Sequence, residues 1–310
     1  MRIFLTGGTG FIGRRLLGLL DQSTHEVLVL VRPQRAAQQS SNPRIQWITG
    51  TLDDVVSYRS ALDQFQPEGC IHLAWYTNPA DYLTAEDANL SQLEASLQLL
   101  RTLKRVRCRR FVAAGTCVEY ALPSPEQLRE ESPTRPSTIY AAAKLAFYHL
   151  SERICVTSGI SFAWGRIFHV YGPGENPNRL VPAAIRTMLS GKDFPASPGD
   201  QVRDYLYVDD IASAFLRLAE TKETGVFNIC SSLPITIRHL LSRIEELCGS
   251  DGRICFGAKK YNPHDPMFIC GCNRRLSALG WRPGMDLGTG LRLTIEGLRQ
   301  PIGGHDEVKV

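Results

Sequence analysis

A glycine-rich segment near the start of the chain restricts its fold more than any other feature. Residues 6–13 read TGGTGFIG and directly follow a short apolar run. Gly8, Gly10 and Gly13 satisfy the pattern G-x-G-x-x-G, and Gly7 begins a variant with glycine at every third position. Glycine lets the backbone turn tightly and approach a pyrophosphate, which the free N–H groups and positive end of a helix can hold. The segment therefore predicts the first strand-to-helix turn of a dinucleotide-binding fold.

Apolar runs of strand length alternate with helix-period segments through the first half of the chain. The expected strands cover residues 3–6, 27–31, 45–49, 70–74 and 111–114, and the expected helices include 12–20 and 85–104. Such alternation predicts a parallel sheet with helices on both faces. Prolines become frequent after Gly165, which indicates a second, smaller unit. We therefore expect an α/β fold, a Rossmann-type doubly wound parallel sheet with a smaller, interleaved C-terminal substrate lobe.

The same patterns suggest where the two units divide. We expect the dinucleotide-binding domain over residues 1–165, with residues 204–230 returning to it. The substrate-binding lobe then covers 166–203 and 231–302. Residues 303–310 are polar and predict a flexible tail.

Composition narrows the classes of function. A chain of 310 residues with 43% hydrophobic and 21% charged residues is typical of an ordinary globular protein. The net charge of +4 is scattered, and the densest basic stretch, 101–110, is typical of a solvated helix end rather than a nucleic-acid site. Without a long apolar run or a leader, we expect a cytoplasmic protein with no nucleic-acid or membrane partner. Nine cysteines without ligand spacing predict reduced thiols and no metal.

Tyr140 and Lys144 form a pair four residues apart, so on a helix they share one face. A nearby ammonium favours the phenolate and lowers the pKa of a phenol from its usual value of about 10. We therefore expect Lys144 to tune Tyr140 as a proton donor. Alone, the pair would more often be an exposed helical tyrosine and lysine, but together with the glycine-rich segment it predicts a hydride-transfer site.

Thr116 is the expected third member of that site. It follows the strand at 111–114, and open α/β sheets bind their ligands at the carboxyl ends of strands. A hydroxyl there can hydrogen-bond a substrate carbonyl or alkoxide beside Tyr140. The predicted catalytic residues are thus Thr116, Tyr140 and Lys144.

The end of the second strand indicates the cofactor. An NAD site places an acid there for the ribose 2′-hydroxyl, whereas this chain has Val31 and Arg32, with Arg35 close by. Arginine suits a 2′-phosphate, which a carboxylate would repel. We predict that NADP(H) is preferred and that NAD(H) is possible; the alternative is that Arg32 simply faces solvent at a strand end.

These motifs together resemble the extended short-chain dehydrogenase/reductase family, specifically its nucleotide-sugar epimerases, dehydratases and ketoreductases. The resemblance covers nearly the whole chain. Further matching blocks are IHLA at 71–74, GRIFHVYGPG at 165–174, RLVP at 179–182, GDQVRDYLYVDD at 199–210, FNI at 227–229 and LGWRP at 279–283. It implies a nucleotide-sugar substrate, and a homodimer for which apolar helix positions are available. Those positions are Leu93, Leu97, Leu100, Leu145 and Leu150.

The resemblance also implies two sets of binding residues. The cofactor set is Gly7, Gly10, Phe11, Ile12 and Gly13 at the pyrophosphate, Arg32, Thr51 and Leu52 towards the adenosine, and Leu73, Ala74, Trp75, Tyr140 and Lys144 at the ribose and nicotinamide. The substrate set is Thr116, Cys117, His169, Val181, Arg203 and Asn262.

Several of these positions depart from the family pattern. Thr51 replaces an acid that contacts adenine, His169 stands where asparagine is common and could be structural, and Asn262 replaces an arginine that assists diphosphate binding. Arg203 suits a diphosphate, since its guanidinium matches phosphate oxygens. The alternative for Arg203 is an ion pair with Asp204 or Asp209.

The residues after Thr116 bear on the reaction. Dehydratases of the family carry an acidic pair there, whereas this chain has Cys117 and Val118. Elimination needs both a general acid and a general base. Glu119 is the next acid, and in an extended segment it would point away from the side of Thr116 unless the chain bends. Cys117 is either a packing residue or a tuned thiol acting as acid or base.

We therefore predict NADPH-dependent reduction of a keto group, at C4, on a nucleotide-activated deoxysugar, with Tyr140 as the proton donor. The alternative is a redox-neutral nucleotide-sugar epimerase or dehydratase with tightly held NAD(P). A non-catalytic NADP-binding regulator on the same fold is a third possibility.

Overall fold

A seven-stranded parallel sheet organises the larger part of the molecule. The computed structural model describes residues 1–35, 41–124, 126–262 and 265–299. The strand order is β10-β6-β5-β4-β1-β2-β3, and every neighbouring pair is parallel. The order reverses between β1 and β4, as in doubly wound nucleotide-binding sheets, so the predicted fold class is confirmed. The strands are β1 (Arg2–Thr6), β2 (Glu26–Val31), β3 (Ile45–Thr49), β4 (Gly69–His72), β5 (Arg110–Thr116), β6 (Ser161–Ile167) and β10 (Gly225–Ile229).

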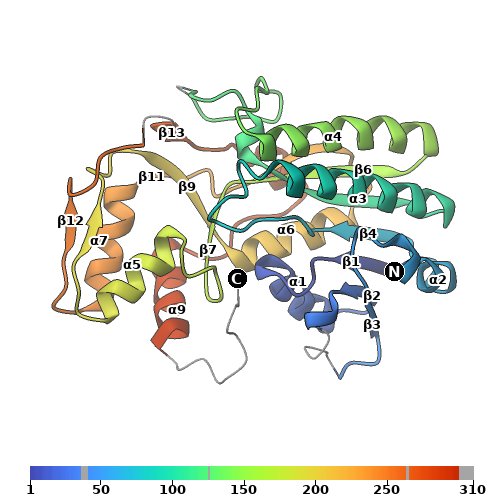
Figure 1. The fold of residues 1–310 in the computed structure, drawn as a ribbon, viewed down its shortest axis with the longest axis horizontal. Coiled ribbons are helices and arrows are strands. Elements are labelled where there is room, and N and C mark those ends of the chain that lie inside the picture. The colour runs from blue at the N-terminus through green and yellow to red at the C-terminus, as the bar shows by residue number, and fades with distance from the viewer. Residues whose placement is uncertain (36–40, 125, 263–264, 300–310) are drawn as a thin grey trace.

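Helices cover both faces of this sheet (Figure 1). One face carries α1 (Phe11–Asp21) and α6 (Val208–Glu220), and the other carries α2 (Val55–Phe65), α3 (Glu86–Arg105) and α4 (Ile139–Ser158). The central strands are buried on both sides, which explains their near-continuous apolar runs. Within β1, Ile3 and Leu5 enter the core under α1 and α6, while Phe4 enters the core under α2 and α3.

The smaller lobe packs helices against short strands. Its helices α5 (Leu180–Leu189), α7 (Ile237–Cys248) and α9 (Leu287–Arg299) enclose a separate apolar core. The strand β9 (Val202–Tyr207) pairs in parallel with β7 (His169–Tyr171) and β13 (Phe268–Ile269), and antiparallel with β11 (Pro234–Thr236). A second pair joins β8 (Phe194–Ala196) to β12 (Ile254–Phe256). The remaining short elements are η1 (Pro33–Arg35), η2 (Cys117–Glu119) and α8 (Arg274–Ala278).

The segment 204–230 divides between the two lobes. Residues 204–207 lie in β9 and pair within the smaller sheet. The following α6 packs against α1, and β10 forms the edge of the large sheet next to β6. The return to the first domain, expected over 204–230, therefore starts with α6. Residues 303–310, the expected tail, lie outside the described residues.

Two findings concern the whole described part of the chain. None of its helices combines the length and apolar character needed to cross a membrane. All nine cysteines are free thiols, and most of them are buried.

Candidate functional site

The glycine loop between β1 and α1 leaves no space for side chains. Gly7 has a φ of +75°, and a Cβ there would lie 2.7 Å from the backbone nitrogen of Ala74. A Cβ on Gly13 would lie 2.0 Å from the carbonyl oxygen of Gly7. Gly10 is the N-cap of α1, and no side chain in the described residues caps this helix or places an acid in its first turn. The loop therefore fits the pyrophosphate of a dinucleotide, since a backbone cradle and a positive helix end face the same point.

A buried hydrogen-bond chain fixes this loop against β4. Thr6 Oγ1 lies 2.7 Å from Nδ1 of His72, whose Nε2 lies 3.0 Å from Oγ of Ser96. Because Ser96 donates to the carbonyl of Gln92, it accepts from His72, so Thr6 is the donor to Nδ1. Burial, together with the charge of Lys144, lowers the pKa of His72 to about 3. The imidazole is thus a neutral structural connector between the first strand and the fourth.

The structure brings Thr116 and Tyr140 together at the carboxyl end of β5. The Thr116 hydroxyl lies close enough to the Tyr140 phenol to act on its pKa, and both residues are nearly buried, with 9% and 8% of their surface exposed. Tyr140 lies at the start of α4, where Thr138 caps the helix and the Tyr140 N–H donates to the carbonyl of Leu83 at 3.3 Å. A hydroxyl and a phenol that lie side by side can both reach one substrate oxygen.

Lys144 does not tune Tyr140 in the way the sequence predicted. Its ammonium donates to the carbonyl oxygen of Ala114 at 2.9 Å and lies 3.8 Å from the centre of the Trp75 ring. Burial raises the pKa of Tyr140, the Tyr82 phenol raises it further, and the Thr116 hydrogen bond opposes them without reversing the direction. The expected lowering of that pKa is therefore wrong for this arrangement, because burial outweighs a lysine that is directed elsewhere.

Burial also lowers the pKa of Lys144, from 10.5 to about 7, although the Glu119 carboxylate opposes the change. Between pH 7 and 10.5 the unfolded chain therefore binds more protons at this residue than the folded chain, so its contribution to stability rises with pH. We expect wild type to gain about 2 kcal/mol in free energy of unfolding over Lys144→Met between pH 7 and pH 9. Urea unfolding at both pH values measures the difference. Lys104→Met, at an exposed position on α3, is the control, and a difference independent of pH would contradict the shift.

Neither side chain that could replace the missing acidic pair is available for acid–base chemistry. Cys117 is buried in an apolar cluster, and burial raises the pKa of its thiol to about 12 although the charge of Arg203 opposes the change. The structure thus favours the packing alternative for Cys117. The chain bends at η2 rather than running extended, so Glu119 turns back towards Thr116, contrary to the alternation argument. Its carboxylate is fully buried and bonded to Trp164 and Arg166.

The smaller lobe brings charged residues to the opposite side of the site. Arg203 is buried, donates to Asp265 Oδ1 at 2.6 Å and does not pair with either acid predicted from the sequence. Asp204 accepts instead from the backbone of Ser231, and Asp209 pairs with Arg15.

His169 in β7 faces the same region. Its ring lies 5.4 Å from the ring of Tyr205, and its Nδ1 has no hydrogen-bond partner among the described residues. Burial, together with the charges of Arg203 and Arg179, lowers the pKa of His169 to about 3. A neutral imidazole and two guanidinium groups therefore lie near one another, a set that suits an anionic, hydrogen-bonding ligand.

Tyr82 and Arg179 join the two sides of the site, and the sequence reasoning missed both. The Tyr82 ring packs edge-on against Tyr140 with 5.0 Å between centroids. Arg179 donates to the Tyr82 hydroxyl at 3.3 Å and lies over the ring, 4.8 Å from its centroid. The position of Tyr82 in the loop after β4 was the one signal in the sequence, because that loop leaves the carboxyl end of a strand.

The other predicted residues lie in the two cores, at the surface or around the glycine loop. Leu52 is buried in the core under α2, and Val181 is buried in the core of the smaller lobe. Arg32 and Asn262 are exposed, while Thr51 is half-buried after β3. The side chain of Arg35 lies outside the described residues. Phe11, Ile12, Leu73, Ala74 and Trp75 are half-buried and line the loop and the end of β4.

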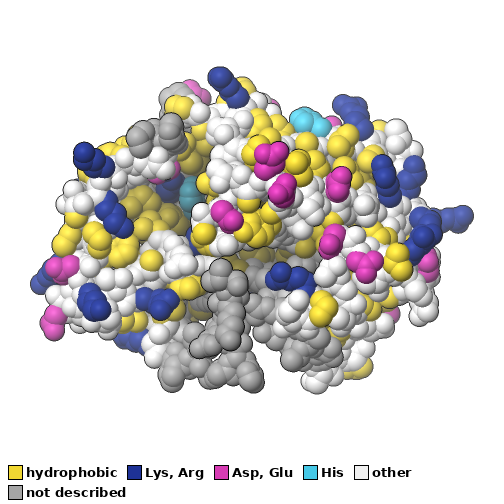
Figure 2. Space-filling model, viewed as in Figure 1, with side chains coloured by type: hydrophobic (Ala, Val, Ile, Leu, Met, Phe, Trp, Pro, Cys, Tyr) yellow, Lys and Arg dark blue, Asp and Glu magenta, His cyan; other side chains and the backbone are white. Residues whose placement is uncertain are grey.

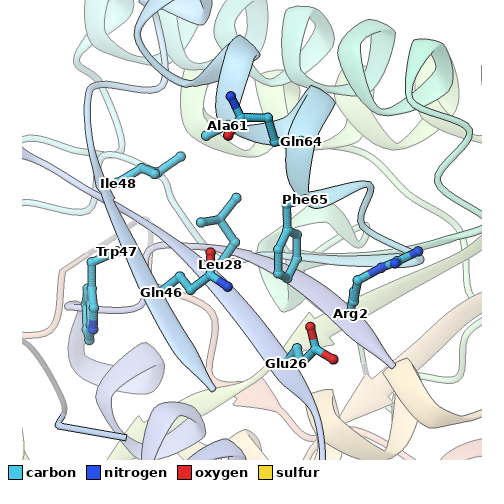
Figure 3. Close-up of a pocket in the computed structure, with 9 residues that line it drawn as sticks. All are labelled: Arg2, Glu26, Leu28, Gln46, Trp47, Ile48, Ala61, Gln64 and Phe65. Carbon is cyan, nitrogen blue, oxygen red and sulfur yellow. The ribbon is translucent and has the colours of Figure 1, made fainter. Parts of the chain in front are cut away.

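Figure 2 shows a hollow on this face, between the α5 and α7 side and the α3 and α4 side, with a histidine visible inside it. A separate pocket of about 410 Å³ lies far from it (Figure 3). That pocket is lined by the start of β1 and β2, by β3 and by the end of α2, and includes Arg2, Glu26 and Phe65. It lies at the amino ends of the strands, so the hollow at their carboxyl ends is the candidate site.

Comparison with known proteins decides the family. A family model described as the NAD dependent epimerase/dehydratase family matches residues 3–230. The chain belongs to this family. The resemblance drawn from the sequence motifs is thereby confirmed, as is the expectation of an enzyme family that uses a nicotinamide cofactor.

Relatives of this epimerase/dehydratase chain differ in their reactions. It is 28% identical to a probable dTDP-glucose 4,6-dehydratase of Sinorhizobium fredii, covering 96% of this chain and 92% of the relative. It is 24% identical to the CDP-abequose synthase of Salmonella typhimurium, covering 93% and 95%. Among solved structures, the UDP-glucose 4-epimerase of Thermotoga maritima with UDP-glucose has a TM-score of 0.88 at 25% identity, covering 96% and 99%. The Thermus thermophilus UDP-glucose 4-epimerase in complex with NAD has a TM-score of 0.83 at 26% identity, with the same coverage.

Proposed function

We propose that this member of the epimerase/dehydratase family reduces a keto group, at C4, on a nucleotide-activated deoxysugar with NADPH. The observation that carries the proposal is the buried phenol of Tyr140 beside Thr116. The two candidate acid–base groups next to it, Cys117 and Glu119, are both unavailable. Burial keeps the phenol protonated, and a protonated phenol is the form that completes a reduction.

The residues of this chain take distinct parts in such a reduction. Bound NADPH supplies the hydride. The glycine loop would hold the pyrophosphate, and Lys144 would contact the nicotinamide ribose. Thr116 orients the keto oxygen by donating a hydrogen bond, and Tyr140 gives its proton to the alkoxide that forms. Tyr82, packed on Tyr140, excludes water from the phenol.

The nucleotide part of the substrate is proposed from the smaller lobe. Arg203 and Arg179 provide guanidinium groups for a diphosphate, and the relatives act on dTDP-, CDP- or UDP-linked sugars according to their names. Asp265, which now holds Arg203, has 39% of its side chain exposed and would yield that guanidinium to a stronger anion.

Redox-neutral chemistry is the second candidate. A dehydratase needs an acid and a base beside the sugar, and Cys117 and Glu119 do not supply them here. An epimerase needs only Tyr140, Thr116 and a retained cofactor, so the same three residues support it. The several epimerases among similar structures favour it over dehydration.

One experiment separates these functions. The purified protein is incubated with NADPH and a 4-keto-6-deoxy sugar nucleotide, and nicotinamide absorbance and products are followed together. Stoichiometric loss of absorbance with a 4-hydroxy product supports the reductase. Conversion of a nucleotide sugar without net cofactor consumption identifies an epimerase, and cofactor binding without any conversion identifies a regulator.

Arg32 is proposed as the residue that favours NADP. It is exposed at the end of β2, where it can meet a 2′-phosphate. We expect Arg32→Glu to weaken NADPH binding by about ten- to one-hundredfold relative to NADH, because a charge-assisted contact becomes repulsion. Titration of both cofactors by fluorescence measures this ratio. Arg44→Glu, exposed before β3, is the charge control; equal NADPH affinity in all three proteins would show that Arg32 only faces solvent.

A homodimer through α3 and α4 also remains a proposal. Leu150 is exposed, whereas Leu100 is fully buried and Leu93, Leu97 and Leu145 are half-buried. Leu90 and Val156 add exposed apolar surface on the same two helices, at 48% and 70%. Sedimentation equilibrium would measure the association. A cytoplasmic location likewise stays a prediction from the sequence.

A further inference from the structure

Glu119 is an unusually placed acid, three residues from the proposed catalytic hydroxyl and fully buried. Its Oε1 accepts the backbone N–H of Thr116 at 2.8 Å. The indole N–H of Trp164 lies 3.2 and 3.1 Å from its two oxygens, and Arg166 Nε donates to Oε2 at 2.7 Å. A buried carboxylate is stable only when paired and hydrogen-bonded, and this one is fully satisfied by protein groups. It has no face left for a substrate.

The bend at η2 makes this contact possible. Residues 117–119 form a single 3₁₀ turn whose N-cap is Thr116, so the chain folds back and Glu119 meets the backbone of Thr116. The two residues form a capping box, in which the Thr116 hydroxyl also accepts from the N–H of Val118 at 3.5 Å. With that lone pair engaged, the hydroxyl proton is directed away from the turn, towards the side where Tyr140 lies. The orientation of the hydroxyl thus depends on the turn that Glu119 closes through its bond to the Thr116 N–H.

Gly115 leaves the space that this arrangement needs. A Cβ on Gly115 would lie 2.2 Å from Trp164 Nε1 and 2.8 Å from Glu119 Oε1. Glycine at this position therefore allows the indole and the carboxylate to meet behind β5. Without it, Glu119 would be displaced from the Thr116 backbone.

Arg166 anchors the carboxylate to the large sheet. It lies in β6 opposite Gly115 of β5, and its guanidinium packs 4.3 Å from the centre of the Tyr120 ring. Tyr120 in turn donates to Asn228 Oδ1 at 2.7 Å. The position of Glu119 is therefore set by β6 as well as by the turn that carries it.

We propose that Glu119 is a positioning residue, which acts through the Thr116 backbone to aim the Thr116 hydroxyl at the substrate oxygen beside Tyr140. Only the expected effect on kcat rests on the proposed function; the contact itself does not. It also gives the acid beside Thr116 a role other than general acid–base chemistry. Isosteric replacement by glutamine should disturb the aim, because one carboxylate oxygen becomes an NH₂ group that faces other donors.

A double-mutant cycle separates positioning from direct chemistry. We expect Glu119→Gln to lower kcat by about ten- to one-hundredfold with little change in KM. When Thr116 is already valine, the same substitution should lower kcat by less than about threefold. Equal losses in the two backgrounds would overturn the proposal, since a proton-transfer group or a general structural role does not need the hydroxyl. Trp164→Phe removes one donor and keeps the ion pair, so it provides a milder variant if Glu119→Gln folds poorly; the same non-additivity is expected of it.

A second readout does not depend on turnover. In protein with ¹⁵N-labelled threonine, the Thr116 amide proton should resonate far downfield because it donates to a carboxylate, and it should move upfield in Glu119→Gln. Asp210→Asn is the control: it removes another buried carboxylate that accepts two backbone N–H groups, from Gly284 and Met285, and should leave the Thr116 signal in place. An unmoved signal in Glu119→Gln would refute the positioning contact. A moved signal in a protein without nucleotide-sugar turnover would uphold the contact and refute the proposed function.

Discussion

Tyr140→Phe is expected to lower kcat by about 10²- to 10⁴-fold while the affinity for the cofactor stays close to that of wild type. The phenol is buried beside Thr116, and burial keeps it protonated at neutral pH. Removing one oxygen leaves the ring and its contact with Tyr82, so the helix start and the cofactor site should be preserved. Stopped-flow oxidation of NADPH, together with fluorescence titration of the cofactor, measures both quantities.

Tyr148→Phe is the matched control, since it removes a phenol two turns along α4 that bonds only to Glu152. Its kcat should equal that of wild type. Retention of full turnover by Tyr140→Phe would exclude the phenol as the proton donor, and Thr116 or water would then have that role. Loss of cofactor affinity in Tyr140→Phe would instead indicate that the phenol acts mainly in binding.

Local patterns in the sequence predicted the parts of the site that depend on neighbouring residues. The glycine loop at 6–13 follows a strand and opens a helix, so its conformation is determined within eight residues. Thr116 could be placed because strand ends meet at one edge of a parallel sheet, and Tyr140 because it begins a helix. The structure brings Thr116 and Tyr140 together as expected.

Partners that come from distant segments could not be read in the same way. Lys144 bonds to Ala114, thirty residues away, and Arg203 to Asp265, sixty-two residues away, whereas the sequence offered only nearer charges. Burial is the second missing quantity, because desolvation decides the direction of the pKa of Tyr140 and cannot be derived from residue spacing. The fold class was predictable because alternating strands and helices can pack in only a few ways, as a parallel sheet covered by helices. The sheet to which β9 belongs was not predictable, since it depends on pairing with the distant strand β7.

Gly13→Ala is expected to have the largest effect on the cofactor, weakening its binding by about one-hundredfold, or roughly 3 kcal/mol. The added Cβ would lie 2.0 Å from the carbonyl oxygen of Gly7 and 2.7 Å from Cα of Gly8, both of which are backbone atoms. Backbone cannot yield by a rotamer change, so α1 must move away from β1 and the cradle for the pyrophosphate must open. The free energy of unfolding should fall by about 3 kcal/mol for the same reason.

Gly18→Ala on the same helix isolates the cause. No atom lies within 4 Å of a Cβ at Gly18, which is exposed near the middle of α1, so alanine there should raise stability by up to about 1 kcal/mol through its helix propensity. Thermal unfolding with and without cofactor compares the two variants. If Gly13→Ala kept cofactor affinity while losing stability, the loop would be a packing turn and not a pyrophosphate site. Equal behaviour of the two variants would show that α1 can shift enough to accept the methyl group.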